Sequence, residues 1–322
     1  MTLETIRGLV KEDLSAIDQF IISELGSDIP LIKEVIEYVL SCGGKRVRPL
    51  MLILVARALA NQGSKHIDLA AVIELVHTAT LLHDDVVDKS TLRRGHKTAN
   101  TVWDSNTSVL VGDFVYSRAF QIVVGLKHSQ TLDIFAKSTH YIAEGEILQL
   151  VNRKNADTTE EFYFDVIKRK TGKLFEMATE LGALIATDNT AHITAMRDFG
   201  MHVGLAYQLI DDAMDYKQPA ELTGKNVGQD LADGKTTLPL IHAMRKSKPA
   251  ELKLMREAIQ SGASDQLEKI LEIIESTDAI KYTADTAKHH ATLAKQALAT
   301  IAPSPYRNAL DELSDFIVER TY

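Results

Sequence analysis

The sequence predicts an all-α protein, and three observations lead to that prediction. Its 322 residues include only 7 prolines and 17 glycines, so the secondary-structure elements should be long. Apolar residues recur every three or four positions through most of the chain, which is the period of a helix that buries one face. No segment shows a convincing alternation of period two, the pattern expected of a half-buried strand.

The N-terminal part of the chain divides into helices at its glycines and prolines. An apolar stripe predicts a first helix from Leu3 to Leu25, which ends at the segment GSDIP. A second, short helix should cover about 31–41, followed by the loop CGGKRVRP. Pro49 suits the first residue of the next helix. Asp68 can cap a further helix that runs through LAAVIELVHTATLLHDDVVD.

The remaining helices follow the same periodicity. Thr158 and Glu161 form the pattern of a capping box at one helix start. The segment 218–236 loses its apolar periodicity and gains glycines and lysines, so it is predicted to be a loop. Residues 1–322 are predicted to form a single domain whose most apolar helices, from about 67 to 217, lie at the centre. The other predicted helices are 105–125, 129–153, 159–186, 191–217, 237–246, 250–261, 265–275, 278–300 and 304–319.

Composition and charge exclude several classes of function. The formal net charge of -8 argues against a nucleic-acid binder, which would show a basic surplus. The one cysteine, Cys42, allows no intramolecular disulfide and suits a reducing compartment. The N-terminus has no secretory or transit pattern, and no stretch approaches the ~18 apolar residues of a membrane span. These features together predict a soluble cytoplasmic protein.

The segment LLHDDVVD sets three aspartates against apolar residues. On a helix, Asp84 and Asp88 share a face and lie ~6 Å apart along the axis. Two carboxylates at that separation repel each other unless a cation lies between them. Magnesium binds one or two carboxylates and completes its octahedron with water and phosphate oxygens. A solvated helix end is the simpler explanation of this one motif.

A second copy of the pattern strengthens the metal interpretation. The segment YQLIDDAMD carries Asp211, Asp212 and Asp215 at the same spacing. Two such helices facing each other would hold several Mg²⁺ ions around one pyrophosphate. Magnesium–carboxylate sites also occur in phosphatases and polymerases, so the basic residues must decide between these classes.

Basic residues cluster in four segments. The segments GGKRVRP, TLRRGHKT, KRKTGKL and TGKNVGQDLADGKTTLP supply more positive charge than one metal-bound diphosphate needs. They suit two diphosphates, one bound on metal and one on arginine and lysine alone. Each cluster taken alone is more often a set of solvated charges than a ligand site. The residues that we single out are Lys45, Arg46, Arg48, Arg93, Arg94, Lys170 with Thr171, Lys225 and Lys235.

Taken together, these segments resemble those of a known protein family. The blocks GGKRVRP, LLHDDVVDKSTLRRG, YQLIDDAMD and GKNVGQDLADGKTTLPL are similar, in content and order, to the signature blocks of the trans (all-E) polyprenyl diphosphate synthases. One departure is Tyr207, where the family usually has phenylalanine. The resemblance implies an all-α bundle around a deep central cavity, a homodimer and three Mg²⁺ ions per active site.

The resemblance also implies a role for each candidate residue. In the first motif Asp84 and Asp88 would bind metal, with Asp85 acting through water, and in the second Asp211 would bind metal, supported by Asp212 and Asp215. The allylic diphosphate would be held by Arg93, Lys170, Lys225 and Lys235, with Gln208 near the developing cation. Isopentenyl diphosphate would be bound by Lys45, Arg48, His77 and Arg94. The residues expected to carry catalysis are Asp84, Asp88, Asp211, Lys170 and Lys235.

The chemistry of such a site needs no nucleophilic side chain. Cleavage of an allylic C–O bond becomes easier when metals and lysines neutralise the charge that grows on the diphosphate. The alkene of isopentenyl diphosphate attacks the resulting cation, and a diphosphate oxygen is the expected proton acceptor. Water must be excluded, or the cation becomes an alcohol. His83 lies beside the metal motif and is interpreted as a structural histidine.

The length of the product should depend on residues below the first motif. Ala79 lies five positions before Asp84, where a bulky aromatic residue closes the pocket at farnesyl length in the family. Alanine leaves the pocket open, so the product is expected to be about octaprenyl, built on farnesyl diphosphate for a quinone side chain. Val76 would line the same cavity and Val123 would lie near its floor. A nonaprenyl (solanesyl) or a shorter geranylgeranyl product stays an alternative.

The same residues argue against two other classes of function. A terpene cyclase would pair one DDxxD motif with a different second motif. A non-catalytic regulatory subunit of a partner synthase would have lost aspartates or lysines from one motif, whereas this chain keeps them. The expected partners are therefore two diphosphate substrates and a second copy of the chain. We expect no transmembrane segment, and contact with a membrane only for release of the product.

Overall fold

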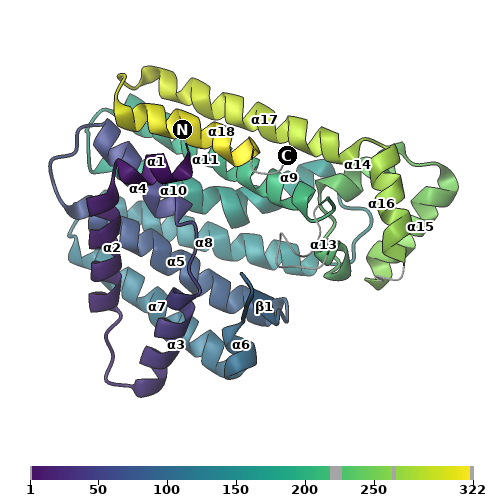
Figure 1. Ribbon diagram of the computed structural model, residues 1–322, viewed down its shortest axis with the longest axis horizontal. Coiled ribbons are helices and arrows are strands. Elements are labelled where there is room, and N and C mark those ends of the chain that lie inside the picture. The colour runs from purple at the N-terminus through teal and green to yellow at the C-terminus, as the bar shows by residue number, and fades with distance from the viewer. Residues whose placement is uncertain (1, 218–226, 263–265, 320–322) are drawn as a thin grey trace. The chain divides into compact units, whose positions relative to one another are not determined.

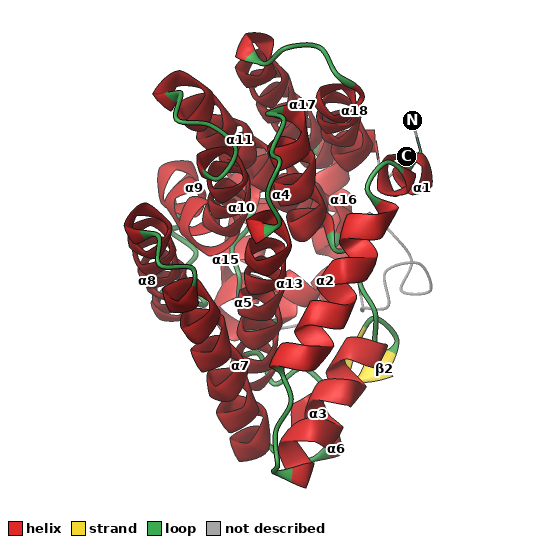
Figure 2. Cartoon of the chain, turned by 90° about the vertical axis from the view of Figure 1, so that its left-hand side faces the viewer, coloured by secondary structure: helices red, strands yellow, loops and turns green. Residues whose placement is uncertain are grey.

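The computed structural model of the chain describes residues 2–217, 227–262 and 266–319. Figure 2 shows that nearly all of this chain is helix, so the prediction of an all-α fold is confirmed. The chain divides into two compact units. The first contains Met1–Ser138, Leu174–Gly200 and Ala297–Leu313, and the second contains Thr139–Lys173, Met201–Gln296 and Ser314–Tyr322. Some helices contribute residues to both units, and the assignment of one domain stays a prediction.

The first unit consists of helices and one small hairpin. Helices α5 and α7 pack along each other, and α2 and α4 pack against α5 (Figure 1). Residues of α8, α10, α11 and α18 also belong to this unit. Its other elements are α1 (Leu3–Gly8), α2 (Lys11–Glu24), α3 (Pro30–Ser41), α4 (Val47–Ala58), α5 (Lys65–Val87), β1 (Leu92–Arg93), β2 (His96–Lys97), α6 (Ala99–Val102), α7 (Ser105–Gly125) and the short 3₁₀-helix η3 (Leu298–Thr300).

Helix α4 forms the centre of the first unit's core. Every side chain from Leu50 to Ala56 is fully buried, so this helix is apolar on all its faces and is surrounded by protein. Helix α5 is similarly buried from Leu69 to Val76. Its C-terminal end, which carries the first aspartate motif, reaches the surface, as does its first turn at Lys65. The core thus holds the motif on a rigid support.

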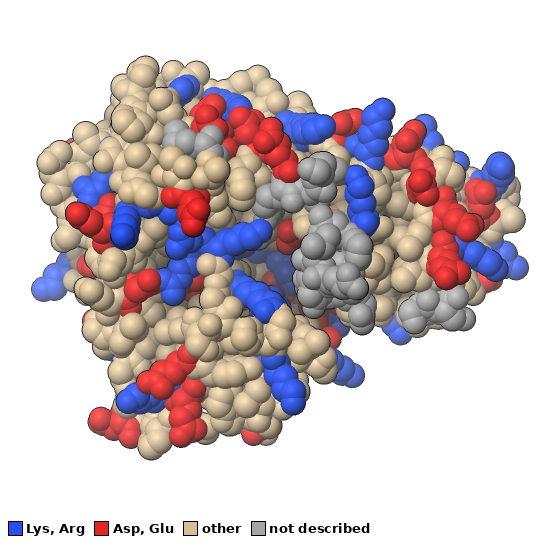
Figure 3. All heavy atoms as spheres, in the orientation of Figure 1, with Lys and Arg blue, Asp and Glu red and all other residues tan. Residues whose placement is uncertain are grey.

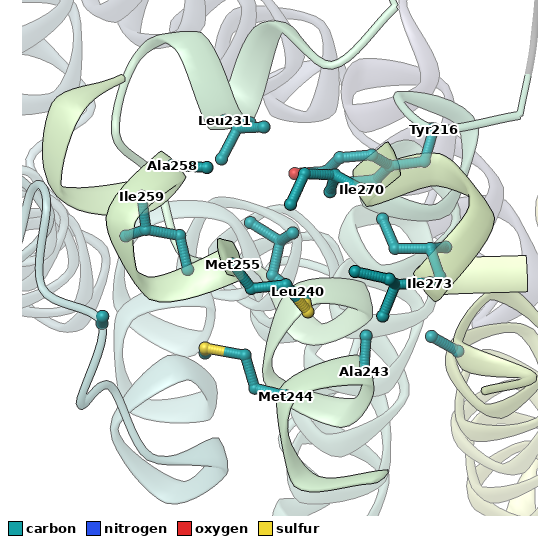
Figure 4. Packing of buried hydrophobic residues seen from close by; sticks show 13 residues of the cluster. Tyr216, Leu231, Leu240, Ala243, Met244, Met255, Ala258, Ile259, Ile270 and Ile273 are labelled. Carbon is teal, nitrogen blue, oxygen red and sulfur yellow. The ribbon is translucent and has the colours of Figure 1, made fainter. Parts of the chain in front are cut away.

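The second unit is also helical. Its elements are α8 (Ser129–Val151, in part), α9 (Glu160–Ile167), the π-helical segment η1 (Lys168–Gly172), α10 (Lys173–Leu184, its first residue only), α11 (Thr190–Met214, in part), α13 (Gln229–Ala232), α14 (Leu238–Lys246), α15 (Pro249–Ser261), α16 (Leu267–Ser276), α17 (Ala279–Ala297, in part) and α18 (Pro305–Glu319, in part). Figure 4 shows one of its cores, in which Leu240, Met255 and Ile270 meet from three of these helices. Tyr216, which follows the second aspartate motif, packs into the same cluster.

Several predicted helix boundaries are wrong. The segment predicted as one helix from Leu3 to Leu25 is two helices, α1 and α2, which are separated at Leu9 and Val10. Helix α4 begins at Val47, because Arg46 takes a left-handed conformation just before it, and not at Pro49. Helix α5 begins at Lys65, so Asp68 lies in its first turn and is not its cap. These ends are set by backbone conformation that the apolar stripe does not record.

Three further features differ from the sequence prediction. The N-cap of α9 is Thr159, whose hydroxyl accepts from the backbone N–H of Phe162 at 3.1 Å, so the box at Thr158 is wrong. A π-helical segment interrupts the helix predicted over 159–186. Strands β1 and β2 pair antiparallel through a turn at Arg94 and Gly95, both with positive φ. Two-residue strands are too short to show alternation. Among the described residues, no helix is long and apolar enough to cross a membrane.

Candidate active site

The first aspartate motif lies at the C-terminal end of α5. Asp88 is the residue that follows the last helical turn, and its N–H donates to the carbonyl oxygen of Asp84 at 2.8 Å. Both side chains are partly exposed, whereas the neighbouring Asp85 is buried. The helix therefore presents two carboxylates one turn apart to solvent and turns the third inward.

Asp85 is held by an arginine of the hairpin. The guanidinium of Arg93 donates from Nε and Nη2 to Oδ1 of Asp85 at 2.9 and 2.7 Å, and from Nε to Oδ2 at 3.1 Å. Burial raises the pKa of Asp85, and the bonds from Arg93 oppose that rise. This fork geometry fixes β1 against the end of α5. Two predicted site residues are thus brought together, although in this arrangement they bind each other.

Two further predicted basic residues of the first unit, Lys45 and Arg94, lie at or beside the Gly43–Gly44 loop. A Cβ on Gly44 would lie only 2.5 Å from Nη1 of Arg94, so glycine lets this arginine lie against the loop backbone. Lys45 and Arg94 are both exposed. Figure 3 shows Lys and Arg side chains gathered over the part of this unit between α2 and β1. Such a cluster is suited to an anion with several oxygens.

Arg48 and His77 form a pair beside this cluster. Nη1 of Arg48 lies 3.2 Å from Nε2 of His77, and the guanidinium stacks over the ring of Phe175 at 4.4 Å. Burial lowers the pKa of His77 well below its ordinary value, and the charges of Arg48 and Arg94 lower it further. A neutral imidazole can accept the hydrogen bond from Arg48 and so orient its guanidinium.

Arg46 and Glu74 are the remaining charged pair here. Arg46 forms an ion pair with Asp18, and its Nε lies 3.9 Å from Oε1 of the buried Glu74. Burial raises the pKa of Glu74, while Arg46, Arg48 and Arg94 act to lower it. Glu74 was not predicted as a site residue. A single buried acid one turn before His77 carries no sequence signal that separates it from the apolar positions around it.

His83 is bound to α7. Its Nε2 lies 3.2 Å from the carbonyl oxygen of Val109 and 3.3 Å from a carboxylate oxygen of Asp113. A Cβ on Gly112 would lie 2.4 Å from the same nitrogen, so the two helices approach closely at this level. These contacts agree with the structural role inferred from the sequence.

The second aspartate motif lies near the end of α11, in the second unit. Asp211 is exposed and Asp215 is partly exposed, while Asp212 is buried. An oxygen of Asp215 accepts from the backbone N–H of Asp230 at 3.0 Å, which secures the start of α13. The pattern of the first motif is repeated: the outer two carboxylates face outward and the middle one faces into the protein.

The middle aspartate of this motif is part of a hydrogen-bonded chain. The hydroxyl of Tyr163 donates to Oδ2 of Asp212 at 2.5 Å, and Nε2 of Gln208 donates to Oδ1 at 2.7 Å. The hydroxyl of Thr171 donates to Oε1 of Gln208 at 2.7 Å. Burial and the charge of Asp230 raise the pKa of Asp212 well above its usual range, against the effect of these bonds. Tyr163, 49 residues away, was not predicted.

The π-helical segment positions Lys170 and Thr171. Nζ of Lys170 donates to Oε2 of Glu146 at 2.5 Å and to Oε1 of Gln149 at 2.9 Å, both on α8. Gly145 allows this approach, because a Cβ there would lie 2.7 Å from the backbone nitrogen of Lys170. A widened turn of this kind often occurs at functional sites. It lets consecutive residues contact α8 and α11.

Lys235 lies in the segment after α13. Its Nζ is 3.1 Å from Oδ2 of Asp233, and its backbone N–H donates to the carbonyl of Asp230 at 2.7 Å. Gly234 has a positive φ, and its carbonyl accepts from the backbone N–H of Lys154. The predicted loop 218–236 therefore contains a short helix and anchored turns where it is described. Lys225 lies outside the described residues.

The residues predicted to control product length are all buried. Val76 and Ala79 on α5 and Val123 on α7 are each less than 2% exposed. Because α5 and α7 pack along each other, the three belong to one pair of helices in the first unit. Their small or modest side chains are therefore internal, as a role in lining a cavity requires.

The carboxylates of both motifs fit a hard divalent cation. Each motif offers oxygen donors at the surface with no thiolate or imidazole among them, which is the donor set of magnesium or calcium. No group of three or more potential protein ligands converges within the described part of the chain. A cation here would thus be held by one or two carboxylates and completed by water and phosphate oxygens, the mode typical of magnesium.

The helices, with a partly exposed aspartate motif in each unit, define the class: an all-α protein with two candidate cation sites. The family model of the polyprenyl synthetases matches residues 29–276, and the chain belongs to that family and is a prenyltransferase. The family depends on a metal and acts on isopentenyl and allylic diphosphates. The family assignment made from the sequence is confirmed.

Three similar proteins illustrate this relationship. An octaprenyl diphosphate synthase of Haemophilus influenzae is 43% identical, with 100% of this chain and 98% of that protein covered. An all-trans-nonaprenyl-diphosphate synthase (geranyl-diphosphate specific) of Rhodobacter capsulatus is 44% identical over 97% of this chain and 96% of that protein. A polyprenyl synthase of Caulobacter crescentus, crystallised with calcium and isoprenyl diphosphate, is 39% identical, with a TM-score of 0.96 over 100% of this chain and 98% of that chain.

Proposed function

We propose that this protein is a long-chain trans-polyprenyl diphosphate synthase that makes octaprenyl diphosphate. It adds isopentenyl diphosphate repeatedly, head to tail, to an allylic diphosphate, with farnesyl diphosphate as the expected primer. The observation that carries the product length is the similarity, at 43% over the whole chain, to an octaprenyl diphosphate synthase. The small, buried Ala79 below the first motif supports a long product.

The aspartates would hold the metal in this proposal. Asp84, Asp88 and Asp211 would bind Mg²⁺, three ions per active site, while Asp215 supports the second motif. Asp85 would act only through water or through Arg93. When bound, the metal would neutralise charge on the departing diphosphate. That the two motifs act on one diphosphate is part of the proposal.

The cations of the chain would bind the two substrates. Lys170, Lys225 and Lys235 would surround the allylic diphosphate, and Arg93 would join them by exchanging part of its bonding to Asp85. Lys45, Arg48 and Arg94, with His77 orienting Arg48, would bind isopentenyl diphosphate without metal. Gln208 would direct its carbonyl dipole toward the developing positive charge, since its amide nitrogen is already bound to Asp212.

The second copy of the chain, its location and the fate of the product belong to the same proposal. A second copy of the chain would cover exposed apolar side chains of α7, among them Leu110 and Val124. A cytoplasmic location fits the single cysteine, Cys42. The octaprenyl product would serve as a quinone side chain and would leave by transient contact with a membrane.

Incubation of the protein with labelled isopentenyl diphosphate, farnesyl diphosphate and magnesium tests the proposal. Chromatography of the dephosphorylated alcohols should give an octaprenyl main product. The Asp84→Ala and Asp211→Ala variants should each be slower by at least ~100-fold with an unchanged circular dichroism spectrum. Absence of any elongation by the wild type, or near-normal rates of these variants at saturating magnesium, would contradict the proposal.

A nonaprenyl product is the second candidate. The observation that favours it is the 44% identity to the Rhodobacter capsulatus nonaprenyl synthase. That enzyme's name specifies geranyl diphosphate, so the same assay with geranyl diphosphate as primer separates the two candidates. A nonaprenyl main product with either primer would replace the octaprenyl assignment.

A further inference from the structure

The buried tyrosine on α9 has no role in the function described above, although it contacts the second aspartate motif. Tyr163 is 4% exposed and Asp212 is 3% exposed, and their hydroxyl–carboxylate bond is 2.5 Å long. A buried carboxylate needs hydrogen-bond donors to compensate for the loss of water. Among the described residues, Asp212 accepts from two side chains, and Tyr163 is one of them.

The bonds of Asp212 determine how the amide of Gln208 is oriented. A carboxylate oxygen accepts from the amide nitrogen, so Nε2 of Gln208 faces Asp212 and Oε1 faces Thr171. Gln208 and Asp212 lie four residues apart on α11, on the same face of the helix. If the carboxylate were free to rotate, the amide could turn over and present its nitrogen, with its partial positive charge, in place of its oxygen.

We propose that Tyr163 is a positioning residue for the condensation reaction: by fixing the carboxylate of Asp212 it keeps the carbonyl oxygen of Gln208 directed toward Thr171 and the reacting cation. The chain Tyr163–Asp212–Gln208–Thr171 thus connects α9 through α11 to the π-helical segment. In this chain Asp212 serves as a relay of orientation and not as a direct metal ligand. The inference rests on the proposed function, because it assigns Gln208 to the cation.

The test is Tyr163→Phe, which removes the hydroxyl and keeps the ring that packs edge-on against Phe164 at 5.5 Å. Loss of one hydrogen bond to a charged group that orients a polar group in the transition state should lower kcat by about tenfold. The KM values for both diphosphates should stay within about twofold, because the hydroxyl is buried and donates to Asp212.

Tyr282→Phe is a matched control from the same unit. The hydroxyl of Tyr282 donates to Oε1 of Glu160 at 2.7 Å, which is another tyrosine–carboxylate bond, remote from the aspartate motif in sequence. Both Tyr282→Phe and Tyr163→Phe should lower Tm by a few degrees. Only Tyr282→Phe should leave kcat unchanged. Equal losses of kcat in the two variants would indicate a general effect on stability and would overturn the proposal.

A double-mutant cycle with Gln208→Ala tests the pathway. If Tyr163 acts through Gln208, adding Tyr163→Phe to the Gln208→Ala variant should change kcat by less than about twofold. Full additivity of the two losses would overturn the proposal. If Tyr163→Phe does not fold, Thr171→Val probes the other end of the chain in the same cycle. Failure of the wild type to elongate at all would contradict the proposed function, whereas an active wild type matched by Tyr163→Phe would contradict only this inference.

Discussion

At the scale of single residues, the two aspartate motifs show the same pattern of burial. The outer aspartates, Asp84 and Asp88 or Asp211 and Asp215, are wholly or partly accessible. The middle aspartates are buried against Arg93 or Tyr163. We therefore expect the three carboxylates of each motif, although chemically identical, to serve two purposes that their burial determines.

The first motif gives a prediction that separates these purposes. Asp84→Asn should lower kcat by roughly 100-fold and change Tm little, since the side chain is partly exposed and binds the metal in the proposed enzyme. Asp85→Asn should lower the free energy of unfolding by about 2 kcal/mol, because the half-buried Arg93 loses its counter-charge. Chemical denaturation and steady-state kinetics of the two variants would measure this difference. The idea fails if both variants lose stability equally.

Sequence reasoning proposed the candidate ligand residues but not the residues that contact and hold them. Asp84, Arg48 and Lys170 stand in compact motifs, and charge next to an apolar stripe is a visible signal. Tyr163 and Glu74 lie within ordinary helical periodicity, and only the tertiary fold brings them to Asp212 and Arg46. Contacts between residues far apart in the chain carry no local pattern, so these partners could not be found from one sequence.

At the scale of elements, helix periodicity predicted most of the fold, and backbone detail accounts for the errors. The π-helical segment Lys168–Gly172 keeps the apolar stripe on both sides, so nothing in the pattern marks it. The hairpin of β1 and β2 is fixed by the positive φ of Arg94 and Gly95 and by the Arg93–Asp85 pair. Such features depend on single residues and on their partners in space.

The close approach of α8 to the π-helical segment predicts an effect of Gly145→Ala. The new Cβ would lie 2.7 Å from both the nitrogen of Lys170 and Cβ of Arg169, so the two backbones must separate. We expect a loss of about 1–3 kcal/mol in the free energy of unfolding and a lower kcat, as Lys170 moves with its backbone. Gly125→Ala is the control, because no atom lies within 4 Å of its Cβ position. Equal stability of the two variants would contradict the contact.

A histidine pair between α11 and α17 predicts a dependence on pH. Nδ1 of His202 lies 3.0 Å from Nδ1 of His290, and burial with the charges of His202, His289 and Lys168 lowers the pKa of His290 to about 4. The unfolded chain, with a histidine pKa near 6.5, takes up a proton that the folded chain does not. The free energy of unfolding should therefore fall as pH drops from about 6.5 to 4.

Denaturation at a series of pH values would measure this effect. His290→Gln should flatten the decrease between pH 6.5 and 4, since its amide does not titrate. His289→Gln, at an exposed position on the same helix, should leave the decrease in place. A profile that does not change in His290→Gln would remove His290 as its source.

At the scale of the whole molecule, we expect the buried length of α5 to connect the proposed metal motif to the size of the product. Val76 and Ala79 precede the motif on α5, in the part of the helix that is buried in the core. A helix rises ~1.5 Å per residue, so each further turn that stays open would allow roughly one more isoprene unit to enter. In the proposed enzyme, product length would then depend on the whole helix and not on one residue.

Ala79→Tyr should shorten the product. The added ring has to occupy space next to α7, and in the proposed enzyme that space holds the growing chain. Chromatography of the dephosphorylated alcohols should show farnesyl- to geranylgeranyl-length products, while Ala79→Ser should keep the wild-type length. An unchanged length in an active, folded Ala79→Tyr variant would place the growing chain elsewhere.

The π-helical turn has a consequence for how this chain can change over time. A π turn holds one residue more than the α-helix that would replace it, and each residue of an α-helix advances the spiral by about 100°. Deleting a single residue between Lys168 and Gly172 would restore regular winding while the helix on either side keeps its phase, because the wide turn is what accommodates the extra residue. Lys170 or Thr171 would then face away from its present neighbours. A single-residue deletion, ordinarily tolerated in a surface loop, should therefore abolish activity in this five-residue segment, because it displaces Lys170 or Thr171.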